Sequence, residues 1–464
     1  MSSRNSHRKI VLVHKVVTIE TPGLGDRSYL IHDGRTAMVI DPQRDIDRML
    51  QAAQTSGVRI SHVLETHIHN DYVTGGLALA QAAGASYVVA AADEVGFSRT
   101  PARDGDEITA GALALTVVAT PGHTPGHLSY VLRAGPGDPV AVFTGGSMLF
   151  GAVGRTDLIS AEQTEPLTRA QYRSVHRLAE ILPEQVAVYP THGFGSFCSA
   201  TPTSGDSSTI GTERRVNVAL TSGEDAFVQE LIAGLGAYPR YYAHMGPANR
   251  GGPAAPDLSV PRTADAADLR RRIDAGEWVV DLRQRRAFAR SHVAGSISFE
   301  LGDPFATYLA WTIPWGTPLT LVGDTPEQVA EAQLQVARVG IDHLAAAAAG
   351  PTGDLAGGRL SSYGVSGFAA LAAAWGRDGL IVLDVRRPDE WRAGHLPGAV
   401  HIPFWELEQR AGEVPDGEVW VHCASGFRAA IGASLLDRAG RQVVHIDDDW
   451  DRAAELGLPV TADD

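Results

Sequence analysis

The first part of the chain alternates short apolar runs with segments of helical periodicity. Apolar and β-branched runs predict strands at 10–17, 29–32, 37–40, 60–64, 87–90, 113–119, 128–132, 140–143 and 186–189. A helical spacing of apolar residues predicts helices at 77–83 and 169–181. Strands mixed with helices in this way are typical of a layered α/β architecture.

The last part of the chain contains a repeated unit. The tripeptide DLR at 281–283 returns 103 residues later as DVR at 384–386, and HVAG at 292–295 returns at the same offset as HLPG at 395–398. Two copies of one α/β unit explain this spacing. A stretch rich in proline and glycine, 246–261, predicts a linker before the first copy. We therefore expect three domains, at 1–255, 256–355 and 360–464.

The net charge and the cysteine content limit the binding partners and the cellular compartment that are expected for this protein. The 464 residues carry a formal net charge of −15, which disfavours nucleic acids and anionic membranes because both bind basic patches. The sequence has neither an apolar run as long as a membrane span nor the apolar stretch of a signal peptide. Its two cysteines, Cys198 and Cys423, exclude a disulfide framework. We expect a cytoplasmic protein with no nucleic-acid or membrane partner.

Three loops that follow predicted strands carry histidines. His67, His69 and Asp71 alternate after one strand, so their side chains can point the same way. His123 and His192 each follow a further strand, and His123 stands on a Pro-Gly turn. Imidazoles combined with a carboxylate suit iron, manganese or zinc. These five side chains therefore predict a metal pocket.

A second site is predicted in the segment VWVHCASGFR at 419–428. An apolar strand leads Cys423 into a turn, and a helical pattern follows at 429–439. A thiol at this junction lies near backbone N–H groups and the positive end of the helix dipole. Arg428 adds a positive charge, and both effects favour the thiolate that attacks sulfur. The residues expected to surround the bound sulfur are Ala424, Ser425, Gly426 and Phe427.

The motifs together resemble two known families. THIHND at 66–71, TPGHTPGH at 120–127, YPTHG at 189–193 and the segment FTGGSMLFGAVGRTDL at 143–158 resemble the metallo-β-lactamase fold, and the ending GRTDL resembles its persulfide dioxygenase branch. The loop CASGFR, with its flanking DVR and HLPG, resembles a rhodanese active site. The resemblance covers essentially the whole chain. It implies an N-terminal αββα sandwich followed by two α/β rhodanese-like domains.

The same resemblance implies a ferrous iron, Fe2+, bound by two histidines and one aspartate. The matching histidines are His67 and His123, but Gly146 stands where the family has the aspartate and offers no ligand. Three imidazoles, with His69 as the third, would suit zinc with a bound water. Alternatively Asp71 supplies the carboxylate and keeps iron, or the pocket holds no metal.

The middle copy departs from the rhodanese pattern. Gly323 stands at the position of Cys423 and Gln328 at that of Arg428, so this copy cannot carry sulfur on a cysteine. We interpret 256–355 as a degenerate rhodanese-like domain. In the last copy, Arg386 either helps to bind an anionic donor or forms a structural ion pair.

These features predict a sulfur-metabolising fusion enzyme. Cys423 would carry sulfur as a persulfide, with thiosulfate, a low-molecular-weight thiol and its persulfide as small-molecule partners. With iron, the N-terminal domain would oxidise the persulfide sulfur to sulfite with dioxygen. The alternative is a rhodanese sulfurtransferase fused to a zinc hydrolase or a metal-free binding module of the same fold. A homodimer is also expected, since this fold group often dimerises.

Overall fold

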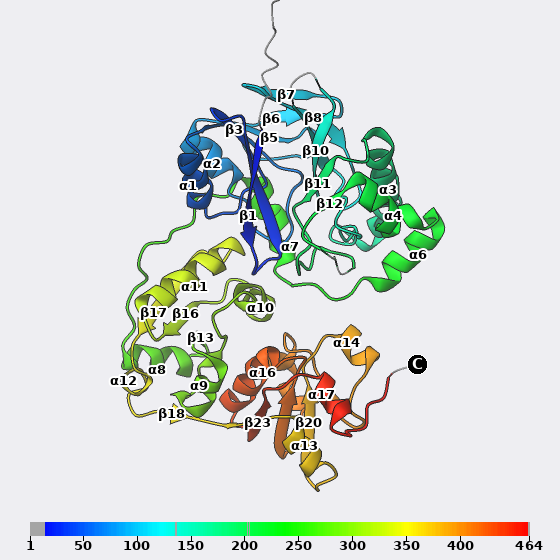
Figure 1. The fold of residues 1–464 in the computed structure, drawn as a ribbon. Helices are drawn as coiled ribbons and strands as arrows, with labels where there is room; N and C mark the ends of the chain where they lie inside the picture. The colour runs from blue at the N-terminus through cyan, green and yellow to red at the C-terminus, as the bar shows by residue number, and fades with distance from the viewer. Residues whose placement is uncertain (1–13, 135–136, 202, 204, 463–464) are drawn as a thin grey trace, which may run out of the picture. The chain divides into compact units, whose positions relative to one another are not determined.

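The computed structural model describes residues 14–134, 137–201, 203 and 205–462. The chain divides into two compact units (Figure 1). The first contains the residues up to Leu235 together with Tyr242–Pro256, and the second contains Gly236–Tyr241 and the residues from Asp257 onward. Both copies of the repeat lie in the second unit, so their division into separate domains stays a prediction.

Two six-stranded sheets face each other in the first unit. Their strand orders are β1-β2-β3-β4-β5-β6 and β12-β11-β10-β9-β8-β7. Buried side chains of both sheets, among them Leu64, Leu115 and Phe143, form one core between them. The strands are β1 (Lys15–Thr21), β2 (Asp26–His32), β3 (Thr36–Ile40), β4 (Arg59–Leu64), β5 (Ser86–Ala90), β6 (Thr100–Ala102), β7 (Glu107–Ala110), β8 (Leu113–Ala119), β9 (Leu128–Ala134), β10 (Pro139–Gly145), β11 (Ala187–Pro190) and β12 (Ser208–Thr209).

Helices cover the outer faces of both sheets (Figure 1). One layer contains α1 (Asp47–Ser56) and α2 (Gly76–Ala83), whose apolar side chains pack on the first sheet. The other layer packs on the second sheet and contains α3 (Ala161–Ile181), α4 (Ile210–Val216), α5 (Val218–Thr221) and α6 (Glu224–Gly234). The order helix, sheet, sheet, helix confirms the predicted αββα sandwich.

Most predicted elements of this unit are present, with three differences. Residues 10–13 of the predicted strand at 10–17 lie outside the described residues, and β1 begins at Lys15. The predicted helix at 169–181 begins earlier, at Ala161. The predicted linker is wrong for its first residues, because α7 (Tyr242–Gly251) is helical in spite of Pro247. Hydrogen bonds from this helix to a distant loop outweigh the weak helical tendency of its glycines and proline.

The second unit contains two similar parallel sheets. The middle copy has the order β15-β13-β16-β17 and the last copy has β21-β20-β22-β23, extended by β19. The copies thus repeat in strand order as well as in sequence, while the rhodanese assignment of the middle copy stays a prediction. The strands of the two sheets are β13 (Trp278–Asp281), β15 (Ile297–Ser298), β16 (Leu319–Gly323), β17 (Leu344–Ala349), β19 (Gly364–Ser366), β20 (Leu380–Asp384), β21 (Val400–His401), β22 (Glu418–His422) and β23 (Val443–Ile446). The strands β14 (His292–Val293) and β18 (Leu360–Ser361) form a separate antiparallel pair.

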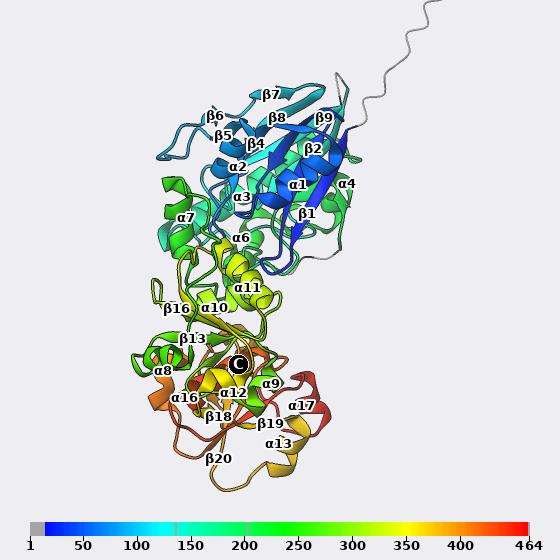
Figure 2. The same ribbon diagram turned by 90° about the vertical axis from the view of Figure 1, so that its left-hand side faces the viewer.

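Helices flank both sheets of the second unit. In both views, the middle sheet lies between α10 and α11 on one side and α8 and α12 on the other (Figures 1 and 2). Parallel strands covered on both faces are expected to be mostly apolar, and the fully buried β13 is apolar except for its last residue, Asp281. The helices are α8 (Ala266–Asp274), α9 (Arg285–Arg290), α10 (Phe305–Thr312), α11 (Pro326–Arg338), α12 (Thr352–Ala356), α13 (Phe368–Ala374), α14 (Pro388–Ala393), α15 (Leu407–Arg410), α16 (Phe427–Arg438) and α17 (Asp451–Glu455).

The two copies also contact each other within the second unit. The N–H of Ser298 in β15 donates to Oγ of Ser434 in α16 at 3.0 Å. Nε2 of His292 lies 3.1 Å from a carboxylate oxygen of Asp437, at the end of the same helix. The helix that begins at the cysteine loop is therefore held by the middle copy. Within the described residues, no helix combines the length and apolar character needed to cross a bilayer.

Candidate metal centre and cysteine loop

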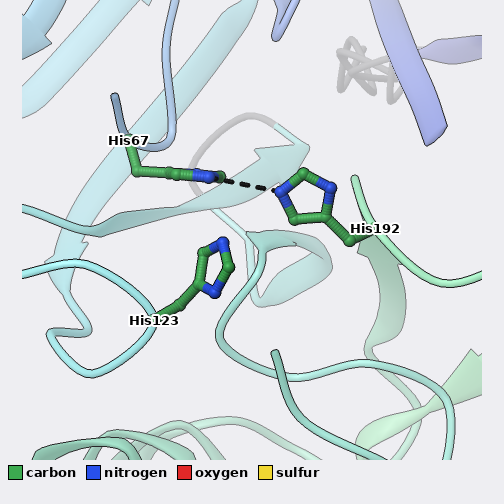
Figure 3. Close-up of side chains that lie close together, drawn as sticks. All are labelled: His67, His123 and His192. Atoms are coloured by element: carbon green, nitrogen blue, oxygen red, sulfur yellow. Dashed lines mark hydrogen bonds between the residues drawn. The ribbon is translucent and has the colours of Figure 1, made fainter. Parts of the chain in front are cut away.

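Histidines from three loops meet in a buried cluster of the first unit. His67, His123 and His192 follow the strands β4, β8 and β11, and each offers a ring nitrogen within 4.8 Å of those of the other two. Figure 3 shows that the nitrogens of His67 and His192 face each other, and their Nε2 atoms lie 3.2 Å apart. All three rings are buried. The ends of three strands therefore converge on one point.

Neighbouring polar groups determine which nitrogen of each ring carries the proton. Thr66 donates its hydroxyl to Asp41 at 2.7 Å and so accepts from Nδ1 of His67 at 2.9 Å. Nδ1 of His123 donates to the carbonyl oxygen of Arg155 at 2.7 Å. We therefore assign the proton to Nδ1 in both rings, which leaves both Nε2 atoms as acceptors. Burial holds the pKa of both imidazoles well below the ordinary value, so both are neutral.

His192 is the charged member of the cluster. Its Nδ1 lies 2.9 Å from Oδ1 of Asp26 and 3.2 Å from Oδ2 of Asp71. Burial opposes the charge, but Asp71 and, after it, Asp26 outweigh burial and raise the pKa of His192 well above its ordinary value. Burial and the neighbouring charge of Asp71 raise the pKa of Asp26 itself to about 8, so Asp71 is the main anionic partner of His192. The Nε2–H of His192 is then the donor to Nε2 of His67. A metal ion bound here would replace this proton, because a ligating imidazole must be neutral.

His69 and Asp71 lie beside the three histidines. Nε2 of His69 is 3.3 Å from a carboxylate oxygen of Asp41 and 3.3 Å from one of Glu65. Burial opposes the charge of His69, but these carboxylates outweigh it and raise its pKa to about 9. His69 and Asp71 also offer ligand atoms within 4.8 Å of His192. The five predicted ligands thus occupy one buried region, but the three imidazoles that share a centre include His192 instead of His69.

Gly146 packs directly against His123. A β-carbon built on Gly146 would lie 2.3 Å from Cδ2 of His123, so a side chain here would require the ring to shift. The N–H of Gly146 donates to Nε2 of His127 at 3.0 Å. Burial lowers the pKa of His127 to about 3, which keeps that ring a neutral acceptor. The imidazole of His123 therefore fills the space that an aspartate at position 146 would need.

Asn249 holds the loop that carries the first ligands, and it was not among the predicted site residues. Its amide nitrogen donates to the carbonyl oxygens of His69 and Tyr72, at 2.8 Å each. Its Oδ1 accepts from the N–H of Thr74 at 2.9 Å. The side chain is buried and comes from α7, in the stretch that the sequence indicated as a linker. The sequence carries no local signal for this role.

The three-histidine cluster fits a metal ion. Nε2 of His123 is buried without a hydrogen-bond partner among the described residues. The far nitrogen of each ring has a hydroxyl, a carbonyl or a carboxylate as its partner, the groups that orient metal-bound histidines. A set of imidazoles suits zinc and ferrous iron alike.

The second predicted site is a turn between β22 and α16. The N–H of Gly426 donates to Sγ of Cys423 at 3.2 Å, as expected for a thiol at a helix N-terminus. Gly426 has a φ of +88°, and a β-carbon there would lie 2.1 Å from Oδ1 of Asp447, so the turn requires glycine. Cys423 is 1% exposed, whereas Ser425 lies at the surface. Any reactant would therefore have to pass the side chains around the turn to reach the thiol.

Both arginines of this site are paired with carboxylates. Arg428 donates to both oxygens of Glu390, at 2.5 and 2.7 Å. The charge of Arg428 is therefore offset by Glu390, a neighbour that the cysteine motif did not indicate. Arg386 forms a similar two-point pair with Asp384 and also lies over the ring of Trp450, 3.8 Å from its centroid. This geometry agrees with the alternative in which Arg386 forms a structural ion pair and does not bind an anionic donor.

The equivalent turn of the middle copy is filled by its own side chain. Oε1 of Gln328 accepts from the N–H of Asp324 at 2.7 Å, and Nε2 donates to the carbonyl oxygen of Leu282 at 3.0 Å. A β-carbon on Gly323 would lie 2.7 Å from Oε1 of Gln328. The glutamine thus occupies the space that a sulfur atom would need at this position.

Comparisons with known proteins agree with these two sites. The metallo-beta-lactamase superfamily model matches residues 22–192, and the rhodanese-like domain model matches residues 368–455. The mitochondrial persulfide dioxygenase ETHE1 of Homo sapiens is 32% identical over 208 residues, which are 44% of this chain and 73% of that protein. The chain belongs to the metallo-β-lactamase superfamily. Its N-terminal part is a metallo-β-lactamase domain with persulfide dioxygenase relatives, and it is fused to a C-terminal rhodanese-like domain.

Two further proteins extend the comparison. A hydroxyacylglutathione hydrolase of Methylococcus capsulatus is 34% identical over 185 residues, 38% of this chain and 66% of that protein. The crystal structure of a metallo-beta-lactamase from Staphylococcus aureus has a TM-score of 0.65 at 26% identity, and the match covers 73% of this chain and 99% of that one. The relatives of this chain and its buried cluster of three histidines together support a metal-binding site.

The cluster predicts that removal of His123 empties the metal site. We expect His123→Ala to lower metal affinity by more than about 100-fold, because losing a ligand costs more than losing a partner of a ligand. The number of metal ions bound per chain, measured by inductively coupled plasma mass spectrometry after gel filtration, checks this prediction. The control is His62→Ala, which removes a half-buried histidine of β4 outside the cluster. A metal content in His123→Ala equal to that of the control would contradict the assignment.

The pairing of Arg428 predicts an effect of Glu390 on anionic donors. Glu390→Gln removes the charge that offsets Arg428, so we expect the KM for thiosulfate to fall about fivefold, the equivalent of about 1 kcal/mol. Steady-state thiocyanate formation measures this KM. Glu413→Gln, which alters the exposed pair with Arg410, is the matched control. An unchanged or higher KM in Glu390→Gln alone would show that Glu390 does not limit access of the anion.

Proposed function

We propose that the chain is a sulfur-metabolising fusion enzyme that transfers sulfur through a persulfide on Cys423. The observation that carries this proposal is the N–H of Gly426 directed at Sγ of Cys423 at the start of α16. This donor stabilises negative charge on sulfur in the thiolate and in the persulfide. The match of residues 368–455 to the rhodanese-like domain supports the same reaction.

The transfer takes two displacement steps and needs no oxidant. The Cys423 thiolate attacks the outer sulfur of thiosulfate, a sulfur–sulfur bond forms, and sulfite leaves with the electron pair of the broken bond. An acceptor then attacks the outer sulfur of the persulfide and restores the thiolate. Cyanide serves as the acceptor in an assay, and a low-molecular-weight thiol is the acceptor that we propose in the cell. Two free cysteines fit the reducing cytoplasm expected from the sequence.

For the N-terminal domain we propose oxidation of a low-molecular-weight persulfide at an iron site. His67, His123 and His192 would hold the ion, and Asp26, Thr66 and the Arg155 carbonyl would orient their rings. Bound ferrous iron would supply open positions for the persulfide sulfur and dioxygen. The human relative named as a persulfide dioxygenase supports this substrate class. The domain would then consume persulfide that the rhodanese-like domain produces or accepts.

A zinc hydrolase is the second candidate for this domain. Three imidazole ligands also suit zinc, whose bound water has a lowered pKa and acts as a nucleophile. A relative named as a hydroxyacylglutathione hydrolase supports this alternative.

We further propose that 256–355 is a degenerate rhodanese-like domain that holds the catalytic copy, and that two chains form a homodimer.

A single substitution tests the role of Cys423 as the sulfur carrier. Cys423→Ser should abolish thiosulfate:cyanide sulfurtransferase activity, because the hydroxyl cannot form the persulfide. Thiocyanate formation is the measurement, and mass spectrometry of the wild-type chain should show one added sulfur after incubation with thiosulfate. Cys198→Ser, a buried cysteine of the other unit, should keep the activity. Retained activity in Cys423→Ser would falsify the assignment.

Metal analysis separates the two functions of the N-terminal domain. Purification without oxygen should give a chain that contains iron and takes up dioxygen with glutathione persulfide. His192→Ala should lose both properties because it removes a ligand. Zinc in place of iron, with hydrolysis of an acylglutathione and no dioxygen uptake, would instead establish the hydrolase. A chain that binds neither metal would exclude both.

A further inference from the structure

A tyrosine from the middle copy lies at the cysteine loop of the last copy. Tyr308 is in α10, outside residues 368–455 that match the rhodanese-like domain. Its ring centroid lies 5.6 Å from that of Phe427, the loop residue between Gly426 and Arg428. It also lies 5.1 Å from the ring of Phe404, which packs edge-on. Two ring contacts therefore place Tyr308 beside the turn.

The surroundings of Tyr308 are those of the cysteine site. Burial is the main cause of the raised pKa of its phenol, and the charges that act on it are those of Arg428, Glu390, Cys423 and Arg387. Tyr308 in turn contributes to the raised pKa of Arg428. These electrostatic effects agree with the aromatic contacts, which place Tyr308 beside the cysteine loop.

The position is fixed by aromatic packing. Trp311, one turn further along α10, stacks on Trp405 at a centroid distance of 4.5 Å and meets Phe404 edge-on at 5.5 Å. These apolar contacts hold α10 against the segment that follows β21, and they do not require the hydroxyl of Tyr308. A phenylalanine could make the same ring contacts. Removal of the hydroxyl would therefore leave these ring contacts in place.

We propose that Tyr308 completes the sulfur-transfer site and that its hydroxyl donates a hydrogen bond to the sulfur that Cys423 carries. The proposal rests on the proposed sulfurtransferase function. The outer sulfur of a cysteine persulfide is anionic, and Glu390 already offsets the charge of Arg428. A neutral donor stabilises the anion during loading. The same donor makes the outer sulfur a better target for an incoming nucleophile during discharge, because it withdraws negative charge.

The proposal also gives the middle copy a role in chemistry. Its own turn is filled by Gln328 and cannot carry sulfur. Through α10 it would still supply a reacting group to the neighbouring copy. The last copy alone would then be an incomplete catalyst, although it contains Cys423, Gly426 and Arg428.

The test compares Tyr308→Phe with Tyr308→Leu in the full-length chain. Single-turnover loading by thiosulfate and discharge to cyanide are followed separately by rapid quench and detection of sulfite and thiocyanate. We expect Tyr308→Phe to slow both steps by about tenfold to a hundredfold, the effect of removing one hydrogen bond to a charged group. Its melting temperature should stay that of the wild type, since the ring contacts remain.

Tyr363→Phe is the matched control. Tyr363 is a tyrosine of the same unit whose ring lies 6.0 Å from that of Phe288, and its buried hydroxyl has no hydrogen-bond partner among the described residues. Wild-type rates in this control are expected. Wild-type rates in Tyr308→Phe, with loss only in Tyr308→Leu, would show a packing role and overturn the proposal. A wild-type chain that forms no persulfide with thiosulfate or glutathione persulfide would instead overturn the proposed function, and this inference with it.

Discussion

The cost of removing charge from water governs both candidate sites. A buried ion without a partner is so unfavourable that the surrounding structure must supply an opposite charge or a hydrogen bond. In the first unit, Asp26 and Asp71 meet the charge of His192, and Asp41 and Glu65 meet that of His69. The proton on His192 thus occupies a position that a metal cation can take over. The carboxylates that stabilise the imidazolium become the groups that orient a ligand.

The same constraint shapes the cysteine loop in a different way. Arg428 is nearly buried and is held by two hydrogen bonds to Glu390, so little of its charge is left for an anionic donor. The remaining stabilisation of sulfur comes from neutral donors, the N–H of Gly426 and, in our proposal, the hydroxyl of Tyr308. Neutral donors support a sulfur anion without binding every anion strongly. In the proposed reaction, this arrangement would favour transfer of sulfur over retention of thiosulfate.

Local sequence patterns indicated the positions of the candidate side chains better than the contacts between them. Alternating histidines after a strand and a cysteine before a helix are local patterns, and both structures are where the patterns indicated. The grouping of the ligands was not predictable, because His192 reaches His67 across 125 positions of the chain. Glu390 carries no local sign of its pairing with Arg428, 38 residues away. Asn249 lies in a stretch whose glycines and proline indicated a linker, and its hydrogen bonds to a loop about 180 residues away keep that stretch in place.

The sequence by itself determined the kinds of element, the repeat and the reactive side chains, because strand alternation, helix periodicity and residue chemistry act over a few neighbouring positions. Only the tertiary structure decided which imidazoles share a centre, which carboxylate pairs with Arg428 and which ring of the middle copy packs against Phe427. The alanines of β17 show the reason clearly: alanine favours helices, yet hydrogen bonds to β16 make Leu344–Ala349 a strand. Contacts between distant segments outweigh local preference wherever burial leaves backbone or charge without water.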